Sequence, residues 1–160
     1  MKKPAFWKLS MGGNDDILDV FDRLRQGLVG AHSRTKKKGF AHESQGAQFV
    51  HTDREGDYFY LCHGNRTTAH PRRGIILLGR FTGPFSVDEG GWAEREFEWI
   101  KTAISAKKLT REHRQQWMPR DNSTFIKIPA KDLKLFESVI LKPYFDLSFS
   151  MLGLKLSSID

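Results

Sequence analysis

The stretch GDYFYLCHGN at residues 56–65, followed after a basic turn by GIILLGRFTG at residues 74–83, decides the fold of this chain. Both runs are rich in β-branched and aromatic residues and are bounded by glycine or asparagine, which is typical of two paired strands. The polar tip at residues 62–65 comes where the first strand ends. We therefore expect a strand pair whose tip forms the floor of a pocket for a small molecule or a base.

Short strands with helices between them are expected on both sides of this pair. Before it we expect a strand at residues 5–9, a helix at about 14–27, a strand at 28–31, a basic loop at 32–40 and a short helix at 43–50. After it we expect an irregular connection at 82–91, strands at 93–100 and 124–128, and a helix that begins at Pro129 and is stopped by Pro143. This order favours an α+β domain, with a strongly curved mixed sheet or partial barrel of about six strands and helices packed outside it.

The length and composition limit the class of protein. A chain of 160 residues holds one domain with a proper core and is too short for two of ordinary size. We expect that domain to span residues 1–147, with residues 148–160 as a tail leading towards a downstream domain. No apolar run approaches the ~20 residues that cross a membrane, and no signal-peptide core follows the first residues, so we expect no membrane partner and a cytoplasmic location.

The charge of the chain favours a polyanionic partner. Its net charge is +7 and its pI is about 9.6, and lysine and arginine side chains that neutralise phosphates release condensed counterions. The basic residues gather in two expected loops, whose members are Arg34, Lys36, Lys37 and Lys38 in the first and Arg66, Arg72 and Arg73 in the second. Solvated surface loops would show the same pattern, so the charge alone leaves both readings open.

Catalytic and metal-binding motifs are absent from the sequence. There is no Gly-x-x-x-x-Gly-Lys-Ser/Thr sequence, and the six histidines do not fall into His-Glu-x-x-His or paired Cys/His spacing. The single cysteine, Cys62, is followed in a strand by His63, so their side chains point to opposite faces and do not form a nucleophile and base pair. We expect no cofactor, no metal and no independent enzyme activity.

The four tryptophans have different expected roles. Trp7 and Trp99 lie within strands among apolar neighbours and are expected in the core, and Trp117 is expected to anchor the loop before the last strand. Trp92 follows two glycines at the start of a strand, where a large ring can project into a cleft and stack on a base. Core packing is the alternative for Trp92.

Four segments taken in order carry a resemblance. They are FWKLS at residues 6–10, GDYFYLCHGN at 56–65, LGRFT at 78–82 and ILKPYF at 140–145. Together they resemble the amino-terminal domain of some McrB-type subunits of modification-dependent restriction systems, a domain of the EVE and YTH-like kind within the PUA-like superfamily. The resemblance covers most of the chain, from about Phe6 to Phe145.

This resemblance implies a pocket that accepts a flipped, chemically modified base from duplex DNA. It places in the pocket residues from the turn after the first strand, from the second strand, from the polar tip and ahead of a late strand. These residues are Ser10, Met11, Asp15, Val29, His32, Ser33, His63, Gly64, Asn65 and Trp92. YTH domains enclose a methyl group with two or three rings, whereas this sequence has Val29 and Met11 near two of those places, which leaves 5-methylcytosine, 5-hydroxymethylcytosine and 6-methyladenine open as the modified base.

Three hypotheses follow for the function. The first is a non-catalytic module for modified DNA, whose full-length parent couples recognition to a GTP-driven motor and a nuclease subunit. In it the basic loops hold phosphates, Trp92 stacks on the extruded base, and polar groups near Ser10, Asp15, His63 and Asn65 bind the edge of the base. The second is an RNA-binding module of the PUA-like or YTH-like kind. The third is a protein-interaction or packing domain with Trp92 in the core.

Overall fold

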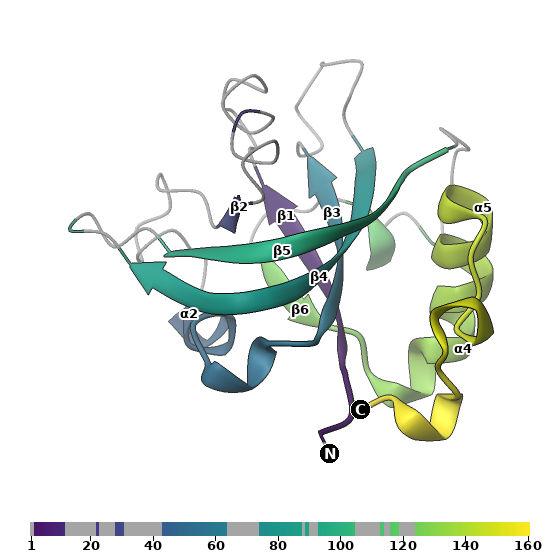
Figure 1. The fold of residues 1–160 in the computed structure, drawn as a ribbon. Coiled ribbons are helices and arrows are strands. Elements are labelled where there is room, and N and C mark those ends of the chain that lie inside the picture. Colours follow the sequence, from purple (N-terminus) through teal and green to yellow (C-terminus); the bar gives the residue numbers. More distant parts are fainter. Residues whose placement is uncertain are drawn as a thin grey trace.

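The computed structural model describes residues 2–11, 22, 28–30, 43–63, 74–87, 89, 93–104, 113, 116–118 and 124–160. Its centre is a six-stranded sheet in the order β2–β5–β4–β3–β1–β6 (Figure 1). The strands are β1 (Phe6–Met11), β2 (Leu28–Gly30), β3 (Tyr58–His63), β4 (Gly74–Val87), β5 (Ala93–Thr102) and β6 (Phe125–Lys127). Only β1 and β3 pair in parallel, and the other four described pairs are antiparallel. The predicted α+β class and curved mixed sheet are confirmed.

The central strand β3 is buried on both faces. All six of its residues are buried, which explains why its sequence is a continuous apolar run rather than an alternating one. Phe59 and Leu61 belong to one hydrophobic cluster, which also contains Phe49 of α2 (Glu43–Phe49). Tyr58, Tyr60 and Cys62 belong to a second cluster, which contains residues of α4 (Leu133–Phe136). We call these two sides of the sheet the α2 face and the α4 face.

The helix α2 and the strand β6 hold each other in place. Both the Thr124 and the Phe125 backbone N–H groups donate to Oε1 of the buried Gln45, each at 2.7 Å. The side chain of Gln45 therefore satisfies two donors at the start of an edge strand. The short turn η1 (Thr52–Arg54) then leads from α2 to β3.

The C-terminal helical run is longer than the sequence predicted. It passes through η2 (Ala130–Asp132), α4, the π-helical turn η3 (Glu137–Leu141) and α5 (Lys142–Phe145). The prediction that Pro143 stops the helix was wrong. Proline lacks an N–H group and clashes with the carbonyl four residues earlier in a regular helix, and the wider turn of η3 directly before it relieves that conflict.

The prediction of an irregular connection at residues 82–86 was also wrong, because β4 continues to Val87. The pairing of β4 with β5 jumps from Phe81–Phe97 to Phe85–Arg95, so extra residues of β4 bulge out of the ladder. Glycine and proline are tolerated at such a bulge, and Gly83 and Pro84 occupy it. They mark a bend in a long strand rather than the end of one.

The residues after the helical run pack against the α4 face. Phe149 and Ile159 are buried there, and the short turns η4 (Ser150–Leu152) and η5 (Leu156–Ser158) lie between them. The Asp160 backbone N–H donates to the Pro4 carbonyl at 2.9 Å, and the two ends of the chain lie together in Figure 1. A domain downstream of this tail stays a prediction.

Candidate nucleic-acid interface

Few of the residues that the sequence proposed for the site lie in the described strands. Ser10 and Met11 end β1, Val29 is the middle residue of β2, and His63 ends β3. The following site residues lie outside the described residues: Asp15, His32, Ser33, Gly64, Asn65, Trp92, Arg34, Lys36, Lys37, Lys38, Arg66, Arg72 and Arg73. The helix expected at about 14–27, apart from Asp22, and the loop expected at 32–40 lie outside them as well. Their roles stay predictions.

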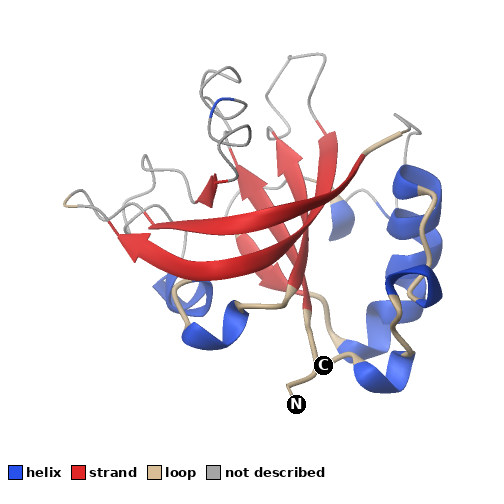
Figure 2. Cartoon of the chain, viewed as in Figure 1, coloured by secondary structure: helices blue, strands red, loops and turns tan. Residues whose placement is uncertain are grey.

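The carboxyl ends of β1 and β3 meet at one edge of the sheet. Met11 and His63 are the last register pair of the two parallel strands, and His63 also pairs with Gly74, the first residue of β4. Figure 2 shows the arrowheads of β1 and β3 at this edge, where β4 begins. In the sequence, residues 12–27 follow Met11 and residues 64–73 follow His63, so both segments begin at this edge.

Ser10 and His63 lie near this edge but on opposite faces of the sheet. His63 is buried and follows Leu61 by two residues, so its side chain lies on the α2 face. Ser10 is the register partner of Cys62, whose side chain lies on the α4 face. The Ser10 hydroxyl oxygen is buried without a hydrogen-bond partner in the described part of the chain. The structure thus brings the backbones of Met11 and His63 together and separates the Ser10 and His63 side chains.

A polar cluster on the α4 face holds a segment of backbone at this edge. Lys8 Nζ donates to the carbonyls of Gln116 at 3.0 Å and Met118 at 3.4 Å, and the Tyr60 hydroxyl donates to the Trp117 carbonyl at 2.9 Å. Trp117 is 2% exposed, which confirms it as a packing anchor. The role of the buried Lys8 was missed, although its place between Trp7 and Leu9 in a strand is the signal that could have found it.

The one cysteine belongs to this cluster and is structural. The Cys62 thiol is fully buried, with Sγ 3.6 Å from the Trp117 carbonyl oxygen. Burial raises the pKa of the Cys62 thiol to about 12, and the nearby Lys8 ammonium offsets only part of that effect. The thiol is therefore protonated at neutral pH and is not a nucleophile.

Trp99 is the main correction to the predicted core. Its side chain is 39% exposed, although the strand pattern placed it with the buried residues. Trp99 pairs with Gly79, next to a register shift between β4 and β5. A Cβ on Gly79 would lie 2.5 Å from the Phe59 ring and 2.9 Å from the Phe97 ring, so these rings already fill the space opposite Trp99. The indole is left outside the core, on the α2 face.

Arg95 is a buried cation that the sequence did not single out. Its guanidinium donates to the carbonyls of Phe49 at 2.7 Å and Gly83 at 3.0 Å, and also to that of His51. Burial lowers the pKa of Arg95 to about 10, with a further contribution from nearby Arg54, and the group stays charged at neutral pH. Arg95 thus joins the end of α2 to the bulge of β4, and it is the register partner of Val29.

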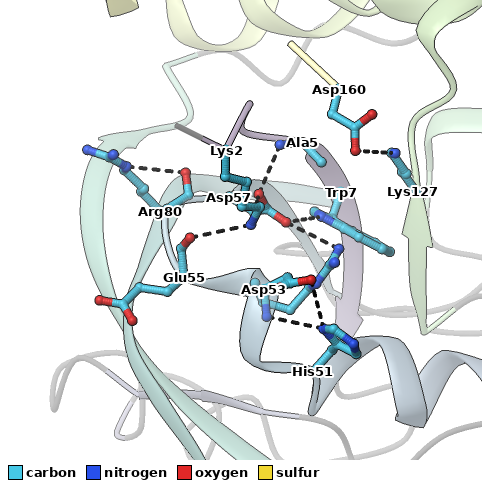
Figure 3. A network of polar contacts seen from close by, with 12 residues as sticks. Lys2, Ala5, Trp7, His51, Asp53, Glu55, Asp57, Arg80, Lys127 and Asp160 are labelled. Atoms are coloured by element: carbon cyan, nitrogen blue, oxygen red, sulfur yellow. Dashed lines mark hydrogen bonds and ion pairs between the residues drawn. The ribbon is translucent and has the colours of Figure 1, made fainter. Parts of the chain in front are cut away.

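The opposite end of β1 and β3 is closed by a buried carboxylate. Asp57 Oδ1 accepts from the Ala5 N–H at 2.9 Å and pairs with Lys2 Nζ at 2.9 Å. Its Oδ2 accepts from Trp7 Nε1 at 3.0 Å and pairs with Arg54 Nη1 at 3.2 Å. Figure 3 shows Lys2, Ala5 and Trp7 converging on this carboxylate. Each oxygen of Asp57 thus has two partners within this chain. The network holds the beginnings of β1 and β3 in place, and the carboxylate has no acceptor position left for a ligand.

Metal-binding clusters and membrane-spanning helices are both absent from the part of the chain that the structure describes. Within it, no three histidine, cysteine, aspartate or glutamate side chains come close enough together to hold a metal ion. Its helices are also too short or too polar for any of them to cross a membrane.

The fold has clear relatives among solved structures. No family model and no curated protein matches the sequence. A structural-genomics protein from Pseudomonas syringae aligns over 84% of this chain and 98% of its own, with a TM-score of 0.53 and 15% identity. A YTH domain of Toxoplasma CPSF4, solved with a 7-mer m6A-modified RNA, aligns over 91% of this chain and 97% of its own, with a TM-score of 0.50 and 11% identity. The YTH domain of mmi1, solved with RNA, gives a TM-score of 0.50 over 94% of this chain and 88% of its own, with 7% identity. The chain therefore has a YTH-like fold.

Proposed function

We propose that this chain is a recognition module for a modified base in nucleic acid. The observation that carries the proposal is the likeness, over 91% of the chain, to a YTH domain solved with m6A-modified RNA. The net charge of +7 supports a polyanionic partner. The edge where β1 and β3 end supports a pocket there, because the segments proposed to line it continue from Met11 and His63.

The first form of the proposal is recognition of duplex DNA by base flipping. Trp92 stacks on the extruded base, and groups near Ser10, Asp15, His63 and Asn65 bind its edge. Flipping costs a few kcal/mol and a stacked aromatic ring returns ~1–3 kcal/mol, so phosphate contacts from the basic loops have to supply the remainder. The modified base is 5-methylcytosine, 5-hydroxymethylcytosine or 6-methyladenine.

This form also assigns the module to a larger assembly. The resemblance to McrB-type subunits motivates a full-length parent in which residues 1–147 recognise DNA and a downstream domain is a GTP-driven motor. A nuclease subunit would then cleave the DNA that the module has selected. Co-purification of the full-length parent with a nuclease subunit would support this assignment, and a parent without a nucleotide-binding motor would overturn it.

The second form is recognition of a modified base in RNA. A specific observation favours it, since both YTH structures described above were solved with RNA. Single-stranded RNA presents unstacked bases, so no duplex has to be opened. The fold and the net charge are compatible with binding of RNA and with binding of DNA.

One set of titrations tests both forms. The domain is titrated with otherwise identical duplexes that carry each of the three modifications, with unmodified duplex, and with matched modified and unmodified RNA. Tighter binding of one modified duplex supports the first form, and tighter binding of modified RNA supports the second. Equal affinity for modified and unmodified ligands of both kinds would overturn the proposal.

Substitution of Trp92 tests the pocket. Trp92→Ala is expected to weaken binding of the modified ligand about tenfold, because a stacked ring is lost, and Trp92→Phe should retain most of the affinity. Met151→Ala is the matched control, since Met151 is an apolar side chain 65% exposed on the C-terminal tail. If Trp92→Ala binds as tightly as the control, Trp92 is not part of the site.

A further inference from the structure

Trp99 presents an indole to solvent from the middle of a strand. Its side chain is 39% exposed, and the ring lies at a tilt of 34° to the buried Phe97 ring, with 6.2 Å between centroids. Its Nε1 donates to Thr102 Oγ1 at 3.0 Å. The ring is therefore supported below by a buried aromatic and fixed at its edge by a hydrogen bond, while part of it is open.

Two carboxylates of β5 lie on the side of the strand away from Trp99. Side chains alternate between faces along a strand, so Glu96 and Glu98 point away from the face that carries Phe97 and Trp99. Both glutamates are exposed, and Glu98 pairs across the sheet with Arg80 on the α4 side. A phosphate backbone that lies along the face of Trp99 therefore avoids the carboxylates of its own strand.

Trp99 shares its face with the proposed pocket edge. Its partner Gly79 pairs with Phe59, and His63 lies four residues further along β3 on the same α2 face. At ~3.3 Å per residue and ~4.8 Å per strand, Trp99 is about 13 Å along the strands and two strands away from His63. That separation suits a binding site of ~4 or more nucleotides, as in other sheet-based binders of single strands.

We propose that Trp99 is a stacking platform for a second, unpaired base on the strand that carries the modified base. This inference rests on the proposed function and specifies its ligand, since it requires a strand that is single-stranded beside the modified base. The faces of a base inside a duplex are covered by its neighbours, so a base free to stack on Trp99 must be unpaired and unstacked. A preorganised ring costs little ordering entropy on binding.

The test uses single-stranded 7-mers of RNA and of DNA. Each carries one modified base at its centre and is made in two forms, one with all bases present and one in which all nucleotides except the modified one are abasic. An unmodified 7-mer and blunt duplexes with and without the modified base are the controls. Wild type and the variants Trp99→Ala, Trp99→Leu and Trp99→Phe are titrated with both forms at the same salt concentration. Trp99→Leu keeps an apolar side chain at this position if Trp99→Ala fails to fold.

The expected result is a loss that depends on the neighbouring bases. Trp99→Ala and Trp99→Leu should weaken binding of the complete 7-mer about tenfold, leave binding of the abasic form unchanged, and leave binding of a blunt modified duplex unchanged. Trp99→Phe should retain most of the affinity. An equal loss with both forms, or no loss with either, would overturn the inference.

The outcome for wild type separates this inference from the proposed function. If wild type binds modified and unmodified 7-mers and duplexes equally, the proposed function fails and the inference fails with it. If wild type prefers the modified base and Trp99→Leu behaves as wild type, only the role of Trp99 is overturned.

Discussion

Trp7 and Trp99 are the same residue type on the same face of one sheet, and the protein uses them in opposite ways. Trp7 is 2% exposed, stacks on Phe125 with 4.2 Å between centroids, and donates to the buried Asp57. Trp99 is 39% exposed, and its Nε1 donates to Thr102, within its own strand. The Trp7 side chain contacts residues of several elements, whereas the contacts described for the Trp99 side chain, with Phe97 and Thr102, lie within its own strand.

The difference distinguishes two regions of the fold. We call the buried region around Trp7 the closed region and the partly exposed region around Trp99 the open region. Around Trp7, each carboxylate oxygen of Asp57 already has two partners from the chain. The polar groups at that end of the sheet are therefore satisfied within the protein. Around Trp99, an aromatic surface is fixed in position and remains partly uncovered. An aromatic ring that is already fixed in position loses little ordering entropy when a ligand stacks on it. Substitutions at the two places should therefore separate loss of stability from loss of binding.

The largest effect is expected from Asp57→Ala, which breaks the closed end. The change removes a buried carboxylate and leaves the Trp7 indole N–H and the Arg54 guanidinium without this acceptor. We expect the free energy of unfolding to fall by about 3–5 kcal/mol, measured by urea denaturation. Asp53→Ala is the control, since the Asp53 side chain is 65% exposed and its loss should change little. A loss below about 1 kcal/mol for Asp57→Ala would contradict the structural role of this network.

A smaller loss of stability is expected from Arg95→Met. This substitution tests the buried part of β5 around Arg95, next to the part where Trp99 is exposed. Methionine fills similar volume but leaves three carbonyls without their donor, those of Phe49, His51 and Gly83. We expect the free energy of unfolding to fall by about 2–4 kcal/mol. Arg80→Met is the matched control, because the Arg80 side chain is exposed and its Nε donates to a single carbonyl, that of Gly56. Equal losses for the two variants would show that Arg95 does not carry the contacts described.

Gly79→Ala tests the reason that Trp99 lies outside the core. The added methyl group would lie 2.5 Å from the Phe59 ring and 2.9 Å from the Phe97 ring, so these two rings would have to shift. Overpacking of this kind costs about 1–3 kcal/mol, and thermal denaturation measures it. Gly153→Ala separates crowding from the strain of a glycine backbone. Gly153 has a positive φ of 74°, and among the described residues a Cβ added there would meet no atom within 4 Å beyond its chain neighbours. A fully stable Gly79→Ala variant would mean that the space opposite Trp99 is not filled as described.

The smallest effect on stability is expected from Trp99→Ala. Since the indole is partly exposed and bonded within its own strand, the free energy of unfolding should fall by no more than about 1–2 kcal/mol, whereas Trp7→Ala should cost about 3–5 kcal/mol. Urea denaturation of the two variants side by side gives the comparison directly. Similar losses at the two positions would remove the distinction between the closed and open regions.

Most strands of this fold could be predicted from local sequence patterns. The apolar run of β3, the alternation at the start of β5 and the short apolar segments of β1, β2 and β6 each have a pattern that one strand produces by itself. The features that were missed depend on pairing between strands. The bulge at Gly83 and Pro84 looks like a turn in the sequence, and the exposure of Trp99 follows from rings on two strands that fill the space at Gly79.

Less of the candidate site could be predicted and then located. Met11, Val29 and His63 lie on described strands. Met11 and His63 were grouped in one pocket by the family resemblance and not by a pattern in the residues themselves. Ser10 was grouped with His63, but a one-residue difference in register puts their side chains on opposite faces. Burial of Lys8 and Arg95 was not foreseen, because charged residues in strands are usually exposed and only the surrounding carbonyls make their burial favourable.

The most direct test of the central claim is a matched titration at two salt concentrations. The ligands are duplex and single-stranded oligonucleotides that are identical except for one modified base. We expect one modified ligand to bind more tightly than its unmodified match at both salt concentrations. Both affinities should fall as salt rises, because phosphate contacts release counterions. Equal binding of modified and unmodified ligands, or no binding of either polymer, would contradict this claim.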